Sequence, residues 1–386
     1  MRQARTILPP YSADTFGVCS ALYELGGMTV MHDASGCNST YSTHDEPRWY
    51  GSGSLVFISG LTEMDAILGN DQKLKEDILS AVETLRPAFV ALAGTPIPMM
   101  TGFDFDAAAG EIEAEAAIPV FGFSTDGMRS YLCGASEALE QYAARMVKWP
   151  VPKEKGTVNL LGATPLDFSL SGTVESVKRL LEENGWRVVS VFAMGAAPEE
   201  LSEAGRASVN LVLSGVGMKT ARLLGRRFGT PYVVGVPIGD AFSGEILASL
   251  EAAQRDGQSR MAFSAWVPDR DEDLLIIGES VIARSLAAAA ALETGRTPRV
   301  VYPLEALPEL AGVLSAGDIR AVGEEEIVAA CQKAKAVIAD PLYRPILPAS
   351  CRLIPLPHEA FSGRMFHSES PDLTTLQIGE RIGDRT

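Results

Sequence analysis

The sequence predicts an α/β protein made of parallel sheets covered by helices. Two observations lead to this prediction. Short apolar stretches alternate along the 386-residue chain with stretches of helical periodicity. The apolar stretches, such as AFVALAG at residues 88–94, are apolar throughout instead of at every second position. Strands of that kind are buried on both faces, as in parallel sheets that have helices on both sides.

The first unit is predicted over residues 1–150. An apolar run, Met28–Met31, resembles a strand and ends in the polar turn His-Asp-Ala-Ser-Gly. Further strands are expected at 54–60, 88–94 and 117–124, and helices at 71–85 and 134–147. Residues 149–156, WPVPKEKG, contain two prolines, a glycine and two lysines, which is typical of a linker to the next unit.

Two further units are predicted over residues 151–268 and 269–386. In the second unit, strands are expected at 157–163, 187–193, 207–215 and 231–239, and helices at 173–186 and 219–229. The third unit begins with an expected strand at 272–280, and the alternation of strands and helices continues through 334–345. The pattern therefore predicts three Rossmann-like parallel-sheet domains around a central cleft. Ligands of such folds bind beyond the carboxyl ends of strands, so we expect functional side chains there.

Charge and composition exclude several classes of partner. The net charge is −16 and the pI about 4.8, which argues against a general nucleic-acid binder and against binding to an anionic membrane. The start of the sequence has no apolar signal region, and no apolar run is long enough to span a bilayer. The glycine-rich turns lack the motifs of nucleotide binding, which favours structural glycines. We therefore expect a cytoplasmic protein without nucleic-acid or membrane partners.

Two of the five cysteines lie where a metal site is conceivable. Cys37 follows Gly36 at the end of the Met28–Met31 run, and Cys19 lies near the start of an expected helix. Two thiolates close together suit an iron–sulfur cluster or zinc, because soft sulfur ligands select these metals. Their spacing matches no short metal-binding motif, so two buried cysteines acting as small apolar residues are an open alternative.

Several segments resemble the nitrogenase component 1-type oxidoreductase family. They are SALYELGGMTVMHDASGCNSTY, LTEMDAILGNDQKLKEDI, TVNLLG, VNLVLSGVGMKTARLLGRRFGTPY and LLIIGES, and the resemblance extends from about residue 12 to about residue 360. The resemblance implies three Rossmann-like domains per chain, a dimer, and a cluster at the subunit interface. It also implies an ATP-dependent iron protein as the electron donor.

The resemblance can be carried over to single residues of the interface cluster. Cys19 and Cys37 match the first two cluster cysteines of the family, whereas Thr95 stands in the place of the third. Two cysteines from each chain of a homodimer make four ligands, enough for one shared 4Fe-4S cluster. Alternatively, a paralogous chain in a heterodimer supplies the missing ligands. Further ligands or neighbours of the cluster are expected among His32, Asp33 and His44, although a histidine near a turn is more often a hydrogen-bonding residue.

The active-site cofactor of nitrogenase has no matching ligand set in this sequence. Ser214 stands where the family has the cofactor cysteine, and His358 is only a loose counterpart of the histidine ligand. The resemblance therefore implies an enzyme that does not fix nitrogen. The interdomain cavity is expected to hold a small organic or tetrapyrrole-like substrate. Its lining is predicted to include Ser124, Arg129, Cys133, Ser214, Met218 and His358.

Three functions follow from these observations. The first is a reductase that receives electrons from the iron protein through the interface cluster. The second is a metallocofactor assembly scaffold or carrier of the same family, which fits the loss of two family cysteines equally well. The third is a periplasmic-type binding protein with Rossmann-like lobes, which the Gly36–Cys37 turn and the absence of a signal region disfavour.

Overall fold

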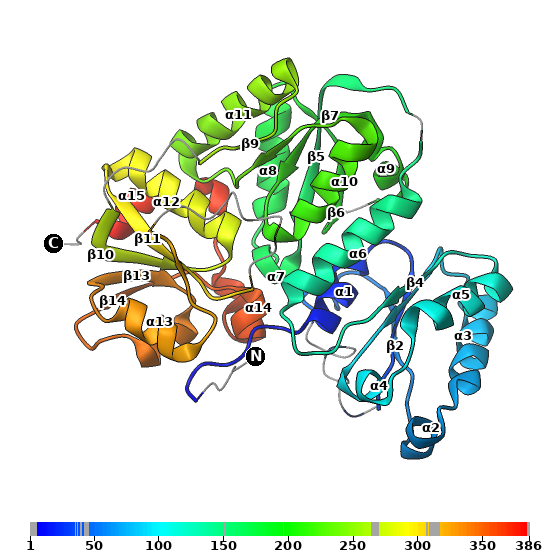
Figure 1. Ribbon diagram of the computed structural model, residues 1–386. Coiled ribbons are helices and arrows are strands. Elements are labelled where there is room, and N and C mark those ends of the chain that lie inside the picture. Colours follow the sequence, from blue (N-terminus) through cyan, green and yellow to red (C-terminus); the bar gives the residue numbers. More distant parts are fainter. Residues whose placement is uncertain are drawn as a thin grey trace.

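The computed structural model contains three parallel sheets in three lobes (Figure 1). It describes residues 6–34, 36, 38, 41, 46–149, 151–195, 197–263, 270–305, 308 and 317–383. The strand orders are β2-β1-β3-β4, β6-β5-β7-β8-β9 and β12-β11-β10-β13-β14. Every pairing found between these strands is parallel. The predicted fold class is confirmed, whereas the predicted domain limits stay predictions.

The first sheet lies in the lobe at the lower right of Figure 1. Its strands are β1 (Met28–Met31), β2 (Leu55–Ile58), β3 (Val90–Ala93) and β4 (Val120–Phe123), and its helices are α2 (Glu63–Leu68), α3 (Asp71–Leu85), α4 (Pro96–Thr101) and α5 (Phe105–Ala116). The expected helix over 71–85 is found with those bounds. Strands β1, β3 and β4 are buried along their whole length, which explains why their sequences are apolar throughout.

The second lobe contains β5, the longest strand among the described residues, and the helices around it. Its strands are β5 (Glu154–Ala163), β6 (Arg187–Ala193), β7 (Ala207–Val212), β8 (Tyr232–Val234) and β9 (Arg260–Met261). Its helical segments are α7 (Pro165–Phe168), α8 (Thr173–Glu183), α9 (Pro198–Ser202), η2 (Ala204–Arg206), η3 (Gly215–Gly217), α10 (Met218–Phe228) and α11 (Gly239–Asp256). Helix α10 ends at Gly229, which adopts a left-handed conformation and stops the helix.

The third lobe carries the last sheet and the C-terminal segment. Its strands are β10 (Arg270–Ile277), β11 (Thr297–Tyr302), β12 (Ile319–Arg320), β13 (Ala336–Ala339) and β14 (Arg352–Pro355). Its helical segments are α12 (Ser280–Thr294), α13 (Glu324–Cys331), η5 (Pro341–Ile346), α14 (Glu359–Ser362), η6 (Gly363–Glu369), η7 (Leu373–Thr375) and α15 (Ile378–Ile382). Segment η7 packs against α8 and α11, so the C-terminal segment joins the third lobe to the second.

Helices α1 (Asp14–Leu22) and α6 (Tyr131–Met146) cross at very close range in the centre of the molecule (Figure 1). Glycines lie at the crossing, because a Cβ atom on Gly17 would overlap the carbonyl oxygen of Tyr131, and one on Gly134 that of Asp14. The backbones therefore touch directly. This contact fixes the position of α1, the helix that carries Cys19.

The segment before α1 docks onto the third lobe. The amide groups of Thr6, Ile7 and Leu8 donate hydrogen bonds to one carboxylate oxygen of Glu324, at 3.0, 2.9 and 2.8 Å. The amide of Ser12 donates to the carbonyl of Ala360 at 2.7 Å. The two ends of the described chain thus hold the lobes together. None of the helices within the described ranges has the length and apolar character needed to cross a membrane.

Candidate functional site

Cys19 lies on α1 in a small apolar and aromatic cluster. The cluster contains Tyr23 of the same helical region, Met31 at the end of β1, and Tyr41, and Cys19 is completely buried in it. Burial, and to a smaller degree the Glu46 carboxylate nearby, raises the pKa of the Cys19 thiol. Such a thiol is protonated and unreactive by itself, and it becomes a thiolate only when a metal ion binds to it.

The second predicted cluster ligand, Cys37, lies outside the described residues, as does His44. Tyr41, which lies between these two residues in the sequence, stacks its ring on Phe16 of α1 with a centroid separation of 5.0 Å. Within the described ranges, no three His, Cys, Asp or Glu side chains are arranged to hold a metal ion. Cys19 is a fitting sulfur donor in an apolar setting, but the described part of one chain does not complete a cluster site.

A buried network of charges ties the next loop to α1. The guanidinium of Arg48 bonds to the carboxylates of Glu46 and Glu24 at 2.6 and 2.9 Å, and it donates to the carbonyl of Ser20 at 2.7 Å. The Glu46 carboxylate also accepts the hydroxyl of Tyr41 at 2.9 Å. Because the cation has several partners, the network orders the loop close to Cys19 instead of leaving it solvated.

His32, Asp33 and Thr95 meet at the carboxyl ends of β1 and β3. The Thr95 hydroxyl donates to the His32 carbonyl at 2.9 Å, and His32 Nδ1 lies 2.8 Å from the Ser59 hydroxyl. The Asp33 carboxylate accepts the amide of Ala34 at 2.8 Å. Burial lowers the pKa of His32 to about 4, so this ring is neutral at pH 7. These three residues lie beyond the carboxyl ends of parallel strands, whereas their role near a cluster stays a prediction.

The low pKa of His32 predicts an acid-sensitive contribution to stability. An unfolded histidine has a pKa near 6.5, so the unfolded chain takes up a proton first as the pH falls from about 6.5 to 4. The free energy of unfolding should fall by roughly 3 kcal/mol across that window because of this residue. We expect His32→Gln to remove this part of the pH dependence, measured by urea unfolding at pH 7 and pH 4.5. An equal loss of stability in both proteins would contradict the prediction.

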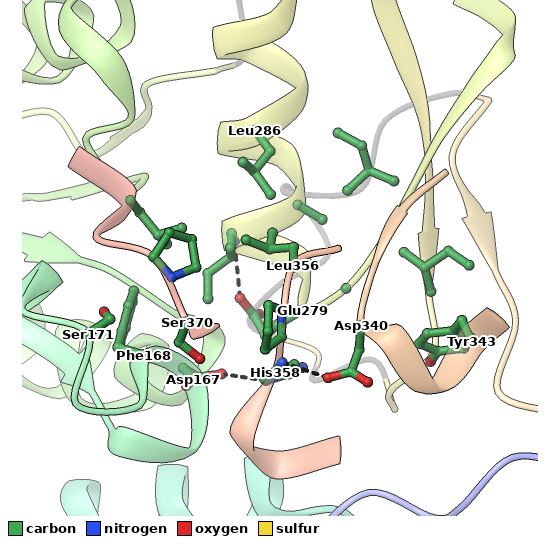
Figure 2. Close-up of a pocket in the computed structure, with 18 of the residues that line it drawn as sticks. Asp167, Phe168, Ser171, Glu279, Leu286, Asp340, Tyr343, Leu356, His358 and Ser370 are labelled. Atoms are coloured by element: carbon green, nitrogen blue, oxygen red, sulfur yellow. Dashed lines mark hydrogen bonds and ion pairs between the residues drawn. The ribbon is translucent and has the colours of Figure 1, made fainter. Parts of the chain in front are cut away.

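Three polar side chains, Tyr131, Asp167 and His358, come together between the lobes. Figure 2 shows Asp167 and His358. Tyr131 comes from α6, Asp167 from α7, and His358 immediately precedes α14. The Tyr131 hydroxyl donates to Asp167 Oδ1 at 2.5 Å, and His358 Nε2 lies 3.3 Å from that hydroxyl and 3.5 Å from the same Oδ1. Burial, reinforced by the Asp167 carboxylate, raises the pKa of Tyr131 well above its usual value. We refer to these three residues as the junction triad.

Neighbouring residues hold the junction triad in place. The other oxygen of Asp167 accepts the Thr164 hydroxyl at 2.9 Å, and the amide of His358 donates to Asp340 at 2.8 Å. Close by on the same two segments, the Ser169 hydroxyl donates to Glu359 at 2.8 Å. The short helices α7 and α14 therefore face each other through two pairs of polar side chains.

A narrow cavity borders the junction triad, and a wide groove lies near it. The cavity encloses about 40 Å³ and has Asp167, Glu279, Asp340 and His358 in its wall (Figure 2). The groove has a volume of about 750 Å³. It is lined mainly by aromatic and apolar side chains of four segments, namely Tyr11 and Phe16, Tyr41, Leu166, and Phe361 and Met365. Tyr11 borders both spaces.

The six residues predicted to line the substrate cavity lie in different places. His358 borders the narrow cavity. The Arg129 guanidinium pairs with Asp14 at 3.1 Å and donates to the carbonyl of the exposed Ser124. Cys133 is half-buried on α6, where burial and then Glu305 raise the pKa of its thiol to about 11.

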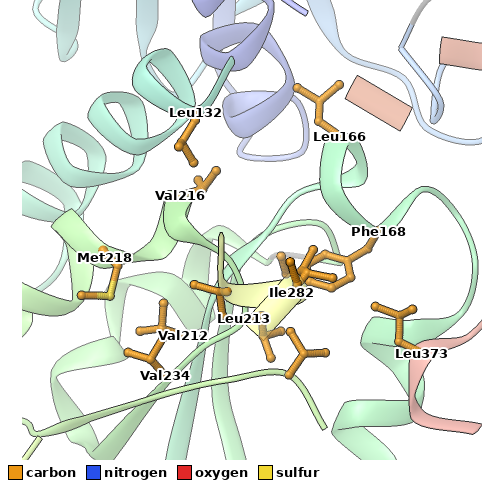
Figure 3. Close-up of a cluster of buried hydrophobic side chains, with 14 of the residues drawn as sticks. Leu132, Leu166, Phe168, Val212, Leu213, Val216, Met218, Val234, Ile282 and Leu373 are labelled. Carbon is orange, nitrogen blue, oxygen red and sulfur yellow. The ribbon is translucent and has the colours of Figure 1, made fainter. Parts of the chain in front are cut away.

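Ser214 and Met218 lie deeper in the protein than the other four. The Ser214 hydroxyl donates to the carbonyl of Gly162 at 2.8 Å, and Met218 is completely buried near Val212 and Val234 (Figure 3). The predicted lining as a set stays a prediction. Tyr131, Asp167 and Glu279 are not identified by the sequence analysis, because no local motif connects segments so far apart. The Thr-Pro start of α7 signals only a helix N-terminus.

Comparisons with known proteins identify the family to which this chain belongs. The profile of the nitrogenase component 1 type oxidoreductases matches residues 15–275. The cofactor biosynthesis protein NifE of Klebsiella pneumoniae is 26% identical over 232 residues, which cover 56% of this chain and 50% of that protein. A subunit of the light-independent protochlorophyllide reductase of Halorhodospira halophila is 30% identical over 253 residues, which cover 59% of this chain and 48% of that protein.

A solved structure supports the fold over nearly the whole chain. The structure described as nitrogenase Cp1 at pH 6.5 superimposes with a TM-score of 0.70, covering 99% of this chain and 93% of that one, at 16% sequence identity. At that identity the likeness concerns the fold alone. The aligned regions span about half the length of the curated relatives. Because the family profile matches well over half of the sequence, the chain belongs to the nitrogenase component 1-type oxidoreductases.

Proposed function

We propose that the protein is a nitrogenase-like reductase component in which two chains share one 4Fe-4S cluster held by Cys19 and Cys37. The main support is the position of Cys19. It is completely buried on α1, three residues after Phe16, which lines the 750 Å³ groove. One turn of α1 therefore carries both the proposed sulfur ligand and a side chain that lines the groove. A bound cluster supplies electrons one at a time.

The groove favours a flat, conjugated substrate. Its volume lies in the range of small-molecule sites, which is roughly 300–1,000 Å³. Tyr11 packs on Phe361 and Phe16 stacks on Tyr41, so aromatic rings stand at both sides of the groove. Such rings stack on planar ligands and exclude water. A small organic or tetrapyrrole-like molecule fits these walls, whereas nitrogen fixation is disfavoured because Ser214 stands in the place of the cofactor cysteine.

The proposed partners are an ATP-dependent iron protein and a second chain, either another copy or a paralogue. Helices α2 and α4 contact each other beyond the carboxyl end of the first sheet and expose large apolar side chains. Leu68 is 71% exposed and Met100 87% exposed, and Met64 and Ile67 are also exposed. Exposed apolar side chains that gather on one face often mark a binding surface. We propose that one of these partners covers this face.

The second candidate function is a metallocofactor scaffold or carrier. It is favoured by the similarity to NifE, a cofactor biosynthesis protein. It is also favoured by Thr95 and Ser214, which stand at positions where the family has cysteines. An experiment with reduced protein distinguishes the two functions. A reductase should lose the paramagnetic signal of its reduced cluster when substrate is added. A carrier should keep that signal and transfer metal to an acceptor protein.

The primary test of the proposal is the metal content. After strictly anaerobic purification, we expect about two iron atoms and two sulfides per chain and a paramagnetic signal after reduction with dithionite, since one 4Fe-4S cluster is shared by two chains. About four iron atoms per chain would show that further ligands take part. Protein without iron would refute the proposal, and the family would then account for the fold only.

A further inference from the structure

We propose that Tyr11 limits the size of the substrate in the groove, because its ring separates the groove from the narrow cavity. The inference rests on the proposed function, in which the groove holds a planar substrate. It adds to that function a residue that determines specificity. Molecules that fit the groove alone are accepted, and molecules with a substituent that needs the cavity are rejected.

Three spaces between the lobes have Tyr11 in their walls. They are the groove of about 750 Å³, the narrow cavity of about 40 Å³, and a second small space of about 50 Å³ beside Arg129 and Glu305. Of the residues that the structure describes, Tyr11 is the only one that lines all three spaces. It is also the only described residue that the groove and the narrow cavity share. A side chain in this position divides the spaces from one another.

The contacts of the buried Tyr11 ring connect it to the walls of both spaces. Phe361, which lines the groove, packs against the ring with a centroid separation of 4.6 Å. His358, which lines the narrow cavity, meets the ring edge-on at 5.4 Å. The Tyr11 hydroxyl lies 3.2 Å from the hydroxyl of Tyr343, another residue of the cavity wall (Figure 2). The ring therefore lies between wall residues of the groove and wall residues of the cavity.

The backbone is fixed on both sides of Tyr11. Three residues before it, the amide of Leu8 donates a hydrogen bond to the Glu324 carboxylate at 2.8 Å. Directly after it, the amide of Ser12 donates to the carbonyl of Ala360 at 2.7 Å. The two residues that precede Tyr11 are both prolines, whose rings restrict the rotation of the backbone. Tyr11 is therefore a fixed partition and not a mobile gate.

The narrow cavity offers an apolar extension of a ligand a favourable environment. Besides its polar groups, its wall contains aliphatic side chains, among them Ile277, Ile282, Leu286 and Leu373. Methylene groups that leave water for such a wall gain free energy in proportion to their number. A ligand in the groove of the wild type does not reach this wall, because the Tyr11 ring lies between. Removal of the ring joins the two spaces and makes this free energy available to longer ligands.

The first experiment measures how tightly the purified protein binds two fluorescent planar probes, dansylamide and its N-butyl derivative. The ratio of the two dissociation constants gives the preference for the butyl group. We expect this preference to be at least tenfold larger in Tyr11→Ala than in the wild type, because the butyl group then enters the joined space. Tyr11→Phe keeps the ring and should resemble the wild type. Phe16→Ala is the matched control, since this ring lines the groove but not the cavity. An unchanged preference in Tyr11→Ala, or an equal increase in Phe16→Ala, would overturn the partition.

The second experiment determines whether the butyl group reaches the cavity. Leu286 is buried and lines the cavity but not the groove (Figure 2). Leu286→Ala should change the affinity for the N-butyl probe only together with Tyr11→Ala, because only then do the residue and the probe share one space. The same change with the Tyr11 ring in place would refute the partition. Circular dichroism checks that each variant is folded, and Tyr11→Val replaces Tyr11→Ala if the latter is not.

The results also separate this inference from the proposed function. Protein without iron that shows the expected probe preferences would refute the reductase and support the partition. Protein with the expected iron content, in which Tyr11→Ala gains no preference for the butyl group, would support the reductase and refute the partition. If neither the wild type nor the variants bind dansylamide, the groove is not a site for planar ligands, and the proposed role of Tyr11 is refuted with it.

Discussion

Replacement of Cys19 or of Cys37 by serine is expected to remove nearly all the iron from anaerobically purified protein. Each chain would contribute only two sulfur ligands, so one substitution leaves two ligands in a dimer that needs four. Serine offers a harder oxygen ligand, which binds iron in such clusters less well than a thiolate. The measurement is iron and acid-labile sulfide per chain, together with the paramagnetic signal after reduction.

Cys331→Ser is the matched control for these two variants. Cys331 is a completely buried cysteine on α13 in the third lobe, and burial raises the pKa of its thiol to about 12. Its substitution perturbs a core, as Cys19→Ser does, but removes no proposed ligand. We expect this variant to keep the wild-type iron content. Equal iron in all four proteins would show that the cysteines are structural.

Gly134→Ala is expected to destabilise the protein by about 3 kcal/mol or more. The new methyl group would overlap the backbone carbonyl of Asp14, and no change of side-chain rotamer can remove that overlap. Helices α1 and α6 would have to move apart, and Cys19 and Phe16 would move with α1. The free energy of unfolding in urea, measured by circular dichroism, tests this expectation.

The control for this substitution is another glycine inside a helix. Gly110 lies in the middle of α5, and a Cβ atom there would meet no atom within 4 Å. Gly110→Ala should therefore stabilise the protein by roughly 0.5–1 kcal/mol, because alanine loses less conformational entropy in a helix. Destabilisation of similar size in both variants would contradict the close crossing of α1 and α6.

The sequence predicts the sheets better than it predicts the junction triad. Stretches such as 88–94 and 117–124 are apolar throughout, and this pattern is enough to place β3 and β4. His32 and Thr95 are both expected near the cluster because of the family resemblance, and they lie at the ends of the neighbouring parallel strands β1 and β3. In contrast, β9 and β12 are two residues long and too short to produce a periodic pattern.

The junction triad has no comparable signal in the sequence. Tyr131 and His358 are 227 residues apart, and each lies beside a helix start whose sequence reports only local structure. Their meeting depends on how three lobes pack, which neither periodicity nor spacing describes. The groove cannot be predicted from the sequence either, because its walls come from four separate segments. These are residues 10–16, Tyr41, Leu166 and residues 359–365.

The docking of the first residues onto the third lobe has a consequence for synthesis of the chain on the ribosome. Leu8 bonds to Glu324, and Ser12 to Ala360, across separations of more than 300 residues. At a synthesis rate of roughly 5–20 residues per second, the partners of this segment are synthesised about 20 to 70 s after it. Meanwhile Tyr11 and Phe16 lack the third-lobe wall of their groove. The segment can therefore reach its final position only after the third lobe has been synthesised.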